Sequence, residues 1–287
     1  MADQALTSFD LVVATIGRVE ELDRLFESLA GQTHTGFRVL LVDQNDDDRL
    51  GVVLQRHPSL DVIRLQSAPG LSRARNAALR HIRGELVAFP DDDCTFPRDL
   101  LERVAQRFAA RPALDGLTGR AEDEGGSSSP SWSRVGATLT RYNLWNRAIS
   151  FTIFLRRPVV EQVGSFDEQL GLGSGRPWSS GEEIDYLVRA LDAGARIEFD
   201  PTIVVVHENK ELSQTALRSV GARDGASIGY IMRKHDYRVG MLGSMLLRPV
   251  GGALRAIAML DGGRARFHLA TLGGRVRGYA SSSKSSA

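Results

Sequence analysis

The chain has 287 residues, of which 42% are hydrophobic and 25% charged, so it can bury a sizeable core and global disorder is not expected. A net charge of +1 gives no overall bias toward an acidic or basic partner, and nucleic acid is not expected as one. The single cysteine, Cys94, favours a reducing, cytoplasmic setting, and neither a secretion signal nor a membrane-spanning helix is predicted.

Short apolar runs alternate with amphipathic helical patterns through the first hundred or so residues. Strands are predicted at 9–14, 37–42, 61–65 and 85–89, and helices at 19–29, 71–82 and 100–108. Such alternation predicts an α/β fold with a doubly wound, mostly parallel sheet flanked by helices. Ligands bind beyond the carboxyl ends of such strands, where Thr15, Asp43 and the run Asp91, Asp92 and Asp93 are expected.

The pattern is less regular in the second half of the chain. Residues 122–133 are too polar and flexible to pack, which predicts a mobile loop. Further strands are expected at 150–155, 196–199 and 203–206, and a helix at 184–193. Helical patterns dominate from residue 212 onward, and the serine-rich end, 280–287, is predicted to be disordered.

The three consecutive aspartates are the strongest chemical signal. Three carboxylates so close together repel one another, and a divalent cation with oxygen ligands would relieve that repulsion. Mg²⁺ typically binds one or two carboxylates together with substrate phosphates, which suits a diphosphate leaving group. The alternative is a solvated acidic turn that caps the next helix, for which Pro97 is a suitable first residue.

Six segments in a fixed order carry a family resemblance: VVATIGR, LLVDQND, GLSRARNAAL, AFPDDDC, GSFDEQLG and WSSGEEIDYLVRAL. Together, over about 9–210, they resemble family 2 glycosyltransferases of the GT-A fold. The resemblance implies a catalytic domain at 1–210, with a nucleotide-binding half at about 1–120 and an acceptor half at about 121–210. A basic helical extension at 211–279 and a tail at 280–287 would follow.

The resemblance also implies roles for individual residues on the donor side. Asp91 and Asp93 match the Asp-x-Asp motif that holds the ribose and the metal-bound diphosphate, with Mg²⁺ or Mn²⁺ as the cofactor. Asp43 and Arg75 match positions that recognise the nucleotide base and ribose, and Thr15 would line the base pocket. Asp92 is grouped with the nucleotide-sugar ligands, its own role open. Asp43 could instead cap a helix.

On the acceptor side, Glu183 stands where the family has its general base, a carboxylate one methylene shorter. Glu182, Glu183 and Asp185 begin a predicted helix, so favourable interaction with the helix dipole is the structural alternative. Asp185 is the second choice for the base. Trp178 could stack on the acceptor sugar or pack in the core, and His207, at the end of a strand, could complete the metal shell or make only a hydrogen bond.

Charge is unevenly divided along the chain. From Asn209 onward there are 13 Lys and Arg against 4 Asp and Glu, a net +9, whereas the preceding residues carry 23 basic and 31 acidic residues, a net −8. Basic amphipathic helices can lie on an anionic membrane surface, and such a surface would suit a lipid-linked saccharide acceptor. The same helices could instead form a homodimer interface, so the location is predicted as cytoplasmic, with peripheral attachment to the inner face of the membrane as an option.

The predicted function is an inverting, metal-dependent glycosyltransferase that uses a nucleotide-diphosphate sugar and a glycan or lipid-linked acceptor, with Glu183 as general base. Two alternatives stay open. A nucleotidyltransferase of nucleotide-sugar synthesis would carry a glycine-rich loop with Arg and Lys after the first strand, where this chain has ATIGRVEEL. A catalytically inactive nucleotide- or glycan-binding module would not need the acidic triplet or Glu183.

Overall fold

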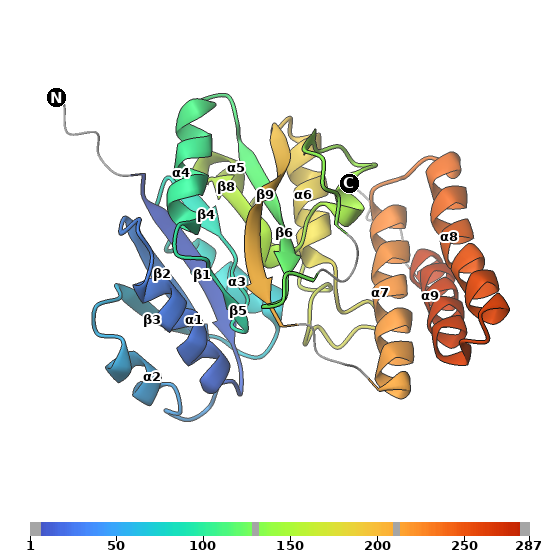
Figure 1. Ribbon diagram of the computed structural model, residues 1–287, viewed down its shortest axis with the longest axis horizontal. Helices are drawn as coiled ribbons and strands as arrows, with labels where there is room; N and C mark the ends of the chain where they lie inside the picture. The colour runs from blue at the N-terminus through green and yellow to red at the C-terminus, as the bar shows by residue number, and fades with distance from the viewer. Residues whose placement is uncertain (1–6, 128–131, 209–212, 282–287) are drawn as a thin grey trace. The chain divides into compact units, whose positions relative to one another are not determined.

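A computed structural model describes residues 7–127, 132–208 and 213–281 and divides the chain into two compact units (Figure 1). The first unit consists of Met1–Pro69, Arg73–Phe166 and Tyr186–Asn209. The second unit consists of Gly70–Ser72, Asp167–Asp185 and Lys210–Ala287.

The first unit is built on a nine-stranded sheet with the order β3-β2-β1-β4-β8-β6-β9-β5, in which β7 also pairs with β9. Its strands are β1 Phe9–Thr15, β2 Phe37–Asp43, β3 Val62–Gln66, β4 Leu86–Ala88, β5 Cys94–Thr95, β6 Gly116–Glu122, β7 Ala137–Thr138, β8 Ile153–Arg156 and β9 Ile197–His207. The first four strands in this order are parallel. Beyond them β8 is antiparallel to both neighbours, β6 and β9 are parallel, and β5 and β7 are antiparallel to β9.

Helices pack on this sheet because strand side chains alternate between its two faces. Leu11 and Val13 of β1 share one buried cluster with Leu25 and Phe26 of α1 and with Val104 of α4. The helices of this unit are α1 Glu20–Ala30, α2 Gly51–Arg56, α4 Leu100–Ala110 and α5 Arg157–Val163, with short 3₁₀ turns η1 Leu144–Asn146 and η2 Ser150–Thr152. Two further helices contribute residues to both units, α3 Leu71–Leu79 and α6 Glu182–Asp192.

The second unit contains three long helices, α7 Gln214–Lys234, α8 Val239–Ala258 and α9 Gly262–Ser281. Glycines let α7 and α9 approach closely: a Cβ added at Gly225 would lie 2.3 Å from the Thr271 carbonyl oxygen, and one at Gly274 would lie 2.3 Å from that of Ala222. Among the described residues, no helix combines the length and apolar character needed to cross a bilayer.

The predicted fold class and the strands and helices of the first hundred residues are confirmed to within a few residues. Several later expectations are wrong. The segments 196–199 and 203–206 belong to one strand, β9, and the segment 150–155 begins as a 3₁₀ turn. At 122–133, a turn at 123–127 agrees with the expected loop, but Glu122 ends β6 and Trp132 is buried, so the two ends are packed; 128–131 lie outside the described residues. Ala280 and Ser281 continue α9 rather than forming a tail, and 282–287 lie outside the description.

Candidate active site at the ends of the strands

Three neighbouring strands end in polar residues at one edge of the sheet. Thr15 of β1 is in register with Asp43 of β2, and Ala14 forms a parallel bridge with Asp91, which follows β4. Thr15 is 1% exposed and Asp43 is fully buried. The sequence-based expectation that these strands deliver polar groups to one edge is therefore confirmed.

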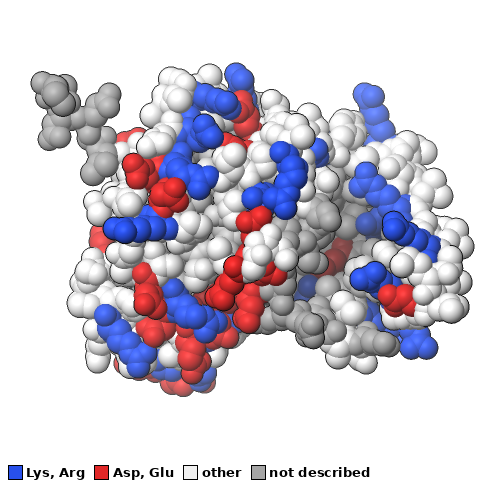
Figure 2. Space-filling view, viewed as in Figure 1, with Lys and Arg blue, Asp and Glu red and all other residues white. Residues whose placement is uncertain are grey.

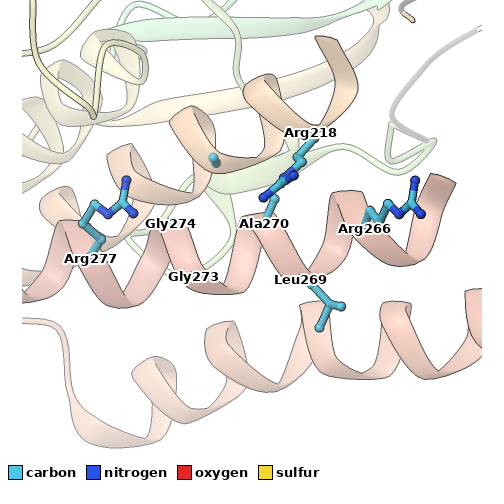
Figure 3. A pocket seen from close by; sticks show the side chains of 8 residues that line it. Arg218, Arg266, Leu269, Ala270, Gly273, Gly274 and Arg277 are labelled. Atoms are coloured by element: carbon cyan, nitrogen blue, oxygen red, sulfur yellow. The ribbon is translucent and has the colours of Figure 1, made fainter. Parts of the chain in front are cut away.

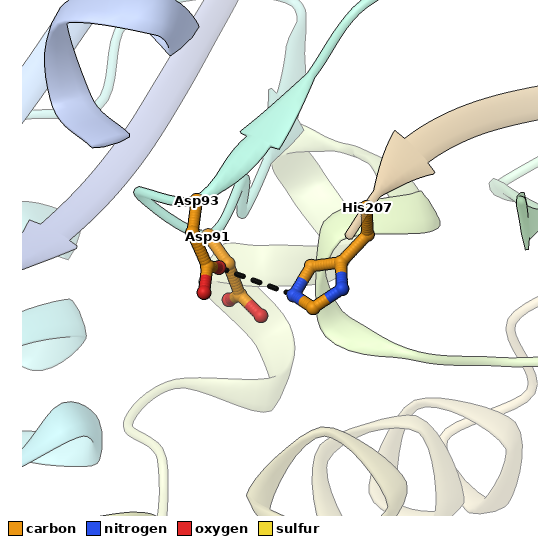
Figure 4. Close-up of side chains that lie close together, drawn as sticks. All are labelled: Asp91, Asp93 and His207. Carbon is orange, nitrogen blue, oxygen red and sulfur yellow. Dashed lines mark hydrogen bonds and ion pairs between the residues drawn. The ribbon is translucent and has the colours of Figure 1, made fainter. Parts of the chain in front are cut away.

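Asp91, Asp93 and His207 converge on one point (Figure 4). The antiparallel pairing of β5 with β9 puts Cys94 opposite His207, so the preceding Asp93 lies beside the imidazole. Each of the three side chains offers a ligand atom within 4.8 Å of the others, and His207 Nε2 lies 3.1 Å from Asp93 Oδ1. Two carboxylates and one imidazole form a donor set that suits a divalent metal ion.

Residues outside the cluster hold these ligands in place. Arg75 donates to Asp91 Oδ1 at 3.2 Å and the Ser150 hydroxyl donates to the same oxygen at 3.1 Å. The Phe151 ring stacks on the His207 ring with centroids 4.8 Å apart and planes within 6°. Fixed ligand orientation of this kind strengthens metal binding, because less ordering is required when the ion arrives.

Arg75 itself is buried, with only 2% of its side chain exposed. Its guanidinium lies 5.8 Å from the Phe89 ring centroid and 5.5 Å from that of Phe166, so aromatic rings and Asp91 surround it. Arg75 is therefore not an exposed charge on the surface of α3.

Arg18 bridges the other two carboxylates of the triplet. Its Nη1 lies 2.6 Å from Asp92 Oδ1 and 2.7 Å from Asp93 Oδ2. Burial raises the pKa of Asp92, against the opposing effect of Arg18. Asp92 is therefore held by an arginine and lies outside the three-residue ligand cluster, whereas Asp93 contacts both Arg18 and His207.

Asp43 accepts hydrogen bonds from several neighbours at the end of β2. Asn45 donates to Oδ1 from its backbone and side chain at 2.9 and 2.7 Å, and Arg64 and Gln66 donate to Oδ2. Burial acts to raise the pKa of Asp43, but the hydrogen bonds from Asn45 and Arg64 outweigh it and hold the pKa below its usual value. The hydrogen bonds thus favour the ionised form of Asp43, and this carboxylate fixes the loop after β2.

A hollow of about 480 Å³ opens beside the cluster. Its lining includes one cation, Arg24, and four carboxylates: Asp93, Asp123, Glu124 and Glu208. An anionic diphosphate would be repelled from such a surface unless a cation lay between them. The electrostatics of the hollow therefore favour a metal ion as part of any diphosphate complex.

The residues predicted to act on the acceptor side belong to the second unit. Glu182 is 4% exposed and Asp185 is fully buried, whereas Glu183 between them is half-buried. Asp185 Oδ1 lies 2.7 Å from Lys234 Nζ and 2.8 Å from His235 Nε2, both at the end of α7. Asp185 therefore ties the first turn of α6 to α7, which leaves Glu183 as the most accessible carboxylate of the three.

Trp178 is also buried, at 8% exposure, and stacks on Tyr230 with ring centroids 4.9 Å apart. Its indole N–H is buried and has no hydrogen-bond partner within the described part of the chain. The Trp178 ring is thus packed inside the protein, which is the core-packing alternative of the sequence analysis. Its indole N–H could still donate a hydrogen bond to a bound hydroxyl.

Several residues of the site were not anticipated from the sequence: Arg18, Ser150 and Phe151 around the acidic triplet, and Lys234 and His235 around Asp185. Arg18 had one usable signal, its place three residues after the end of the first strand. The others are brought to the site only by strand pairing and helix packing.

Comparisons with known proteins bear on this site. Residues 10–164 match the model of "Glycosyl transferase family 2". The pre-mycofactocin glycosyltransferase of Mycobacterium tuberculosis is 26% identical over 278 residues, an alignment that covers 91% of this chain and 54% of that protein. The chain thus spans about half the length of this curated relative.

Two solved structures resemble the chain over 94% of its length. The mannosyltransferase PcManGT from Pyrobaculum calidifontis, in complex with GDP-Man and Mn²⁺, has a TM-score of 0.60 at 16% identity and is covered over 86% of its chain. TarS 1–349 of S. aureus, in complex with UDP-GlcNAc, has a TM-score of 0.58 at 17% identity and is covered over 91% of its chain.

Proposed function

The chain belongs to glycosyl transferase family 2 and has the GT-A fold of a glycosyltransferase, and from this premise we propose that it is an inverting, metal-dependent enzyme. It would move a sugar from a nucleoside diphosphate to a hydroxyl of a glycan or lipid-linked saccharide. The observation that carries the proposal is the convergence of Asp91, Asp93 and His207 within 4.8 Å beside an acidic hollow.

The ligand cluster fits a resident Mg²⁺ or Mn²⁺. Asp91, Asp93 and His207 would hold the ion, and the imidazole favours Mn²⁺, since Mg²⁺ prefers oxygen ligands. When bound, such an ion supplies Lewis acidity to the diphosphate leaving group. Arg75 and Ser150 orient Asp91, and Arg18 offsets the mutual repulsion of Asp92 and Asp93.

Donor recognition would fall to the polar strand ends of the first unit. Thr15 and Asp43 line the edge next to Asp91, and Arg75 supports it from α3. Asp43 would act mainly through the loop it fixes, because its oxygens already accept from Asn45 and Arg64. The solved neighbours carry GDP-Man in one case and UDP-GlcNAc in the other, so we propose a nucleoside-diphosphate sugar as the donor class.

Glu183 is our proposed general base. Its carboxylate would take the proton of the acceptor hydroxyl as that oxygen bonds to the anomeric carbon and the bond from that carbon to the diphosphate oxygen breaks. One displacement from the opposite face inverts the anomeric centre. A positioned base contributes about 10²–10⁴-fold to such a step. Glu182 and Asp185 are buried and would shape the helix turn, and the Trp178 N–H is a candidate donor to the acceptor.

We further propose that residues 1–210 form the catalytic domain and that the basic helices at 211–279 attach it to its surroundings. An anionic membrane on the cytoplasmic side would present a lipid-linked acceptor, and pairing of two copies through the same helices is the alternative. The nucleotidyltransferase alternative loses support, because the chain belongs to a glycosyltransferase family.

The proposal is tested by nucleoside diphosphate release from a panel of nucleotide-sugars with Mn²⁺, in the presence of glycan acceptors. EDTA is expected to abolish turnover, and turnover that survives EDTA would contradict the metal role. Glu183→Gln should keep donor binding and lose transfer by about 10²-fold or more. Glu161→Gln, at an exposed position on α5, is the matched control and should keep full activity.

A further inference from the structure

Exposed apolar side chains gather on the last two helices. Thirteen large hydrophobic side chains are exposed in the described part of the chain, and eight of them lie between residues 239 and 276. On α8, Leu247 is 68%, Leu254 63% and Ile257 57% exposed. Large apolar side chains that are exposed together on one unit often mark a surface that another body covers.

The apolar residues on the outside of α8 are not needed for the packing of that helix. Met245, Pro249, Ala253 and Ala256 already form a buried stripe on the opposite side. Pro249 has no N–H to give to the Met245 carbonyl, and Arg275 of α9 donates to that oxygen instead. The inner side of α8 is thus satisfied within the unit, while its outer side stays apolar.

Arginines accompany the exposed leucines at the same helical spacing. Arg248 and Arg255 follow Leu247 and Leu254 by one residue each, and both pairs repeat every seven residues, so all four share one side of α8. We call this side, with the exposed Ile257, the α8 outer face. Residues 239–281 contain six arginines and one acid, Asp261. Figure 2 shows the same contrast, with blue dominating over α7 to α9 and red mixed with blue over the first unit.

A hollow between α7 and α9 adds further guanidinium groups to this unit. It measures about 450 Å³ and is lined by Arg218 of α7 and by Arg266 and Arg277 of α9. Figure 3 shows Arg218 extending from α7 toward Ala270, with the other two arginines on either side along α9. Such a hollow can accept phosphate groups, for which arginine has the matching donor geometry.

We propose that the α8 outer face docks on an anionic lipid bilayer, with Leu247, Leu254 and Ile257 at the acyl boundary and Arg248 and Arg255 at the headgroup phosphates. Amphipathic helices with this composition lie in the plane of a membrane interface. A second copy of the chain fits less well, because pairing these faces would bring like charges together. The inference deepens the membrane part of the proposed function, yet vesicle binding needs neither donor nor metal, so the two can fail separately.

The test is flotation of the full-length chain with vesicles of phosphatidylcholine alone or of equal parts phosphatidylcholine and phosphatidylglycerol. The wild type should float strongly with the anionic vesicles and only weakly with phosphatidylcholine alone. Leu247→Glu combined with Leu254→Glu should lower the partition coefficient by about tenfold or more. The matched control, Val135→Glu, changes a side chain that is 73% exposed in the first unit and should bind like the wild type.

A second pair of variants isolates the charge. Arg248→Gln with Arg255→Gln should lower binding by about tenfold or more, whereas Arg80→Gln with Arg98→Gln, exposed arginines of the first unit, should have little effect. Thermal melting of each variant shows that it is folded. Equal flotation of the wild type and the leucine variant would overturn the proposal. So would absence of binding together with a dimer, seen by sedimentation, that the leucine variant dissociates.

Discussion

Asp43 shows how one buried carboxylate can organise a loop of the site. It is fully buried, and both of its oxygens accept hydrogen bonds, from Asn45 on one side and from Arg64 and Gln66 on the other. These bonds keep the carboxylate ionised in the folded protein despite its burial, so its pKa lies below the ordinary value of 3.8. The negative charge of Asp43 therefore contributes to the stability of the folded structure.

Replacing Asp43 with Asn is expected to destabilise the fold by about 1–3 kcal/mol at neutral pH, because Arg64 loses its ionised partner. A group whose pKa is lower in the folded state stabilises above its unfolded pKa, and that stability is lost as the pH falls through the folded value. The difference between wild type and variant should thus shrink below pH 3.8. Urea unfolding at neutral and acidic pH measures the difference in unfolding free energy between wild type and Asp43→Asn. Asp46→Asn, at an exposed position, is the control. A pH-independent difference would contradict the assignment.

His207 is the residue whose role in the cluster is most directly testable. Its Nε2 faces Asp93 and its ring is held by Phe151. Loss of one of three protein ligands should weaken Mn²⁺ binding, in the presence of a nucleoside diphosphate, by roughly tenfold or more. Titration calorimetry compares His207→Ala with His81→Ala, which changes an exposed histidine of the same unit. Unchanged Mn²⁺ affinity in His207→Ala would leave the histidine as a hydrogen-bond partner only.

The site residues that could be predicted are those at the end of a strand or a few residues beyond it. Asp43, Asp91 and His207 each stand where an apolar run stops, so their place at the sheet edge follows from topology. Arg18 and Ser150 could not be assigned in this way. Arg18 is 74 residues from Asp92 along the chain, and Ser150 is 59 residues from Asp91, so only folding brings them together.

Among the helices, the contact of α7 with α9 depends on residues without side chains. Gly221, Gly225 and Gly229 repeat every four residues on α7 and lie against Phe267, Thr271 and Arg275 of α9. Gly274 and Gly278 of α9 lie in turn against Ala222 and Ala226 of α7, so the two backbones touch. This spacing puts all the small residues of a helix on one side. Gly273 and Gly274 are neighbours on α9 but differ in their surroundings. A Cβ added at Gly273 would meet nothing within 4 Å, whereas one at Gly274 would meet the backbone of α7.

Gly273 and Gly274 therefore make a matched pair of stability variants. Gly274→Ala would place a Cβ 2.3 Å from the Ala222 carbonyl oxygen, and overpacking of this kind should destabilise the helical unit by about 1–3 kcal/mol. Gly273→Ala meets nothing within 4 Å and should stabilise the helix by up to about 1 kcal/mol. Circular dichroism during thermal unfolding follows both variants. Stabilisation of equal size in both would show that helix propensity, and not the contact with α7, decides.

Strand prediction was weakest where β6 meets β9. The β6 sequence contains two glycines and little apolar character, so it gave no strand signal. Asp200 and Pro201 interrupt the pattern of β9 and suggested two strands. The register of β6 with β9 shifts around Gly119, where a Cβ would lie 2.3 Å from the Ile203 carbonyl oxygen. The interruption at Asp200 and Pro201 is thus an irregularity within the single strand β9. It cannot be recognised from the β9 sequence without the pairing of β9 with β6.

Across the whole chain, charge is unevenly divided. The residues before Asn209 carry a net −8 and include the acidic hollow, whereas those from Asn209 onward carry a net +9. An anionic membrane surface would attract the residues from Asn209 onward and repel the preceding residues. The asymmetry therefore favours attachment through the C-terminal helices alone and leaves the acidic site to bind cations.

This charge distribution predicts how vesicle binding depends on salt. The attraction between the basic helices and anionic lipid should weaken as the Debye length falls from about 10 Å at 0.1 M salt to about 3 Å at 1 M. The apolar contact of the α8 outer face is not screened in this way, so part of the binding should persist in the wild type and vanish in the Leu247→Glu, Leu254→Glu variant. Flotation across a salt series measures both components, with donor turnover on a water-soluble acceptor followed in parallel to show that the enzyme stays folded. Binding that does not change with salt would contradict the electrostatic part, because six arginines against one aspartate over residues 239–281 should respond to screening.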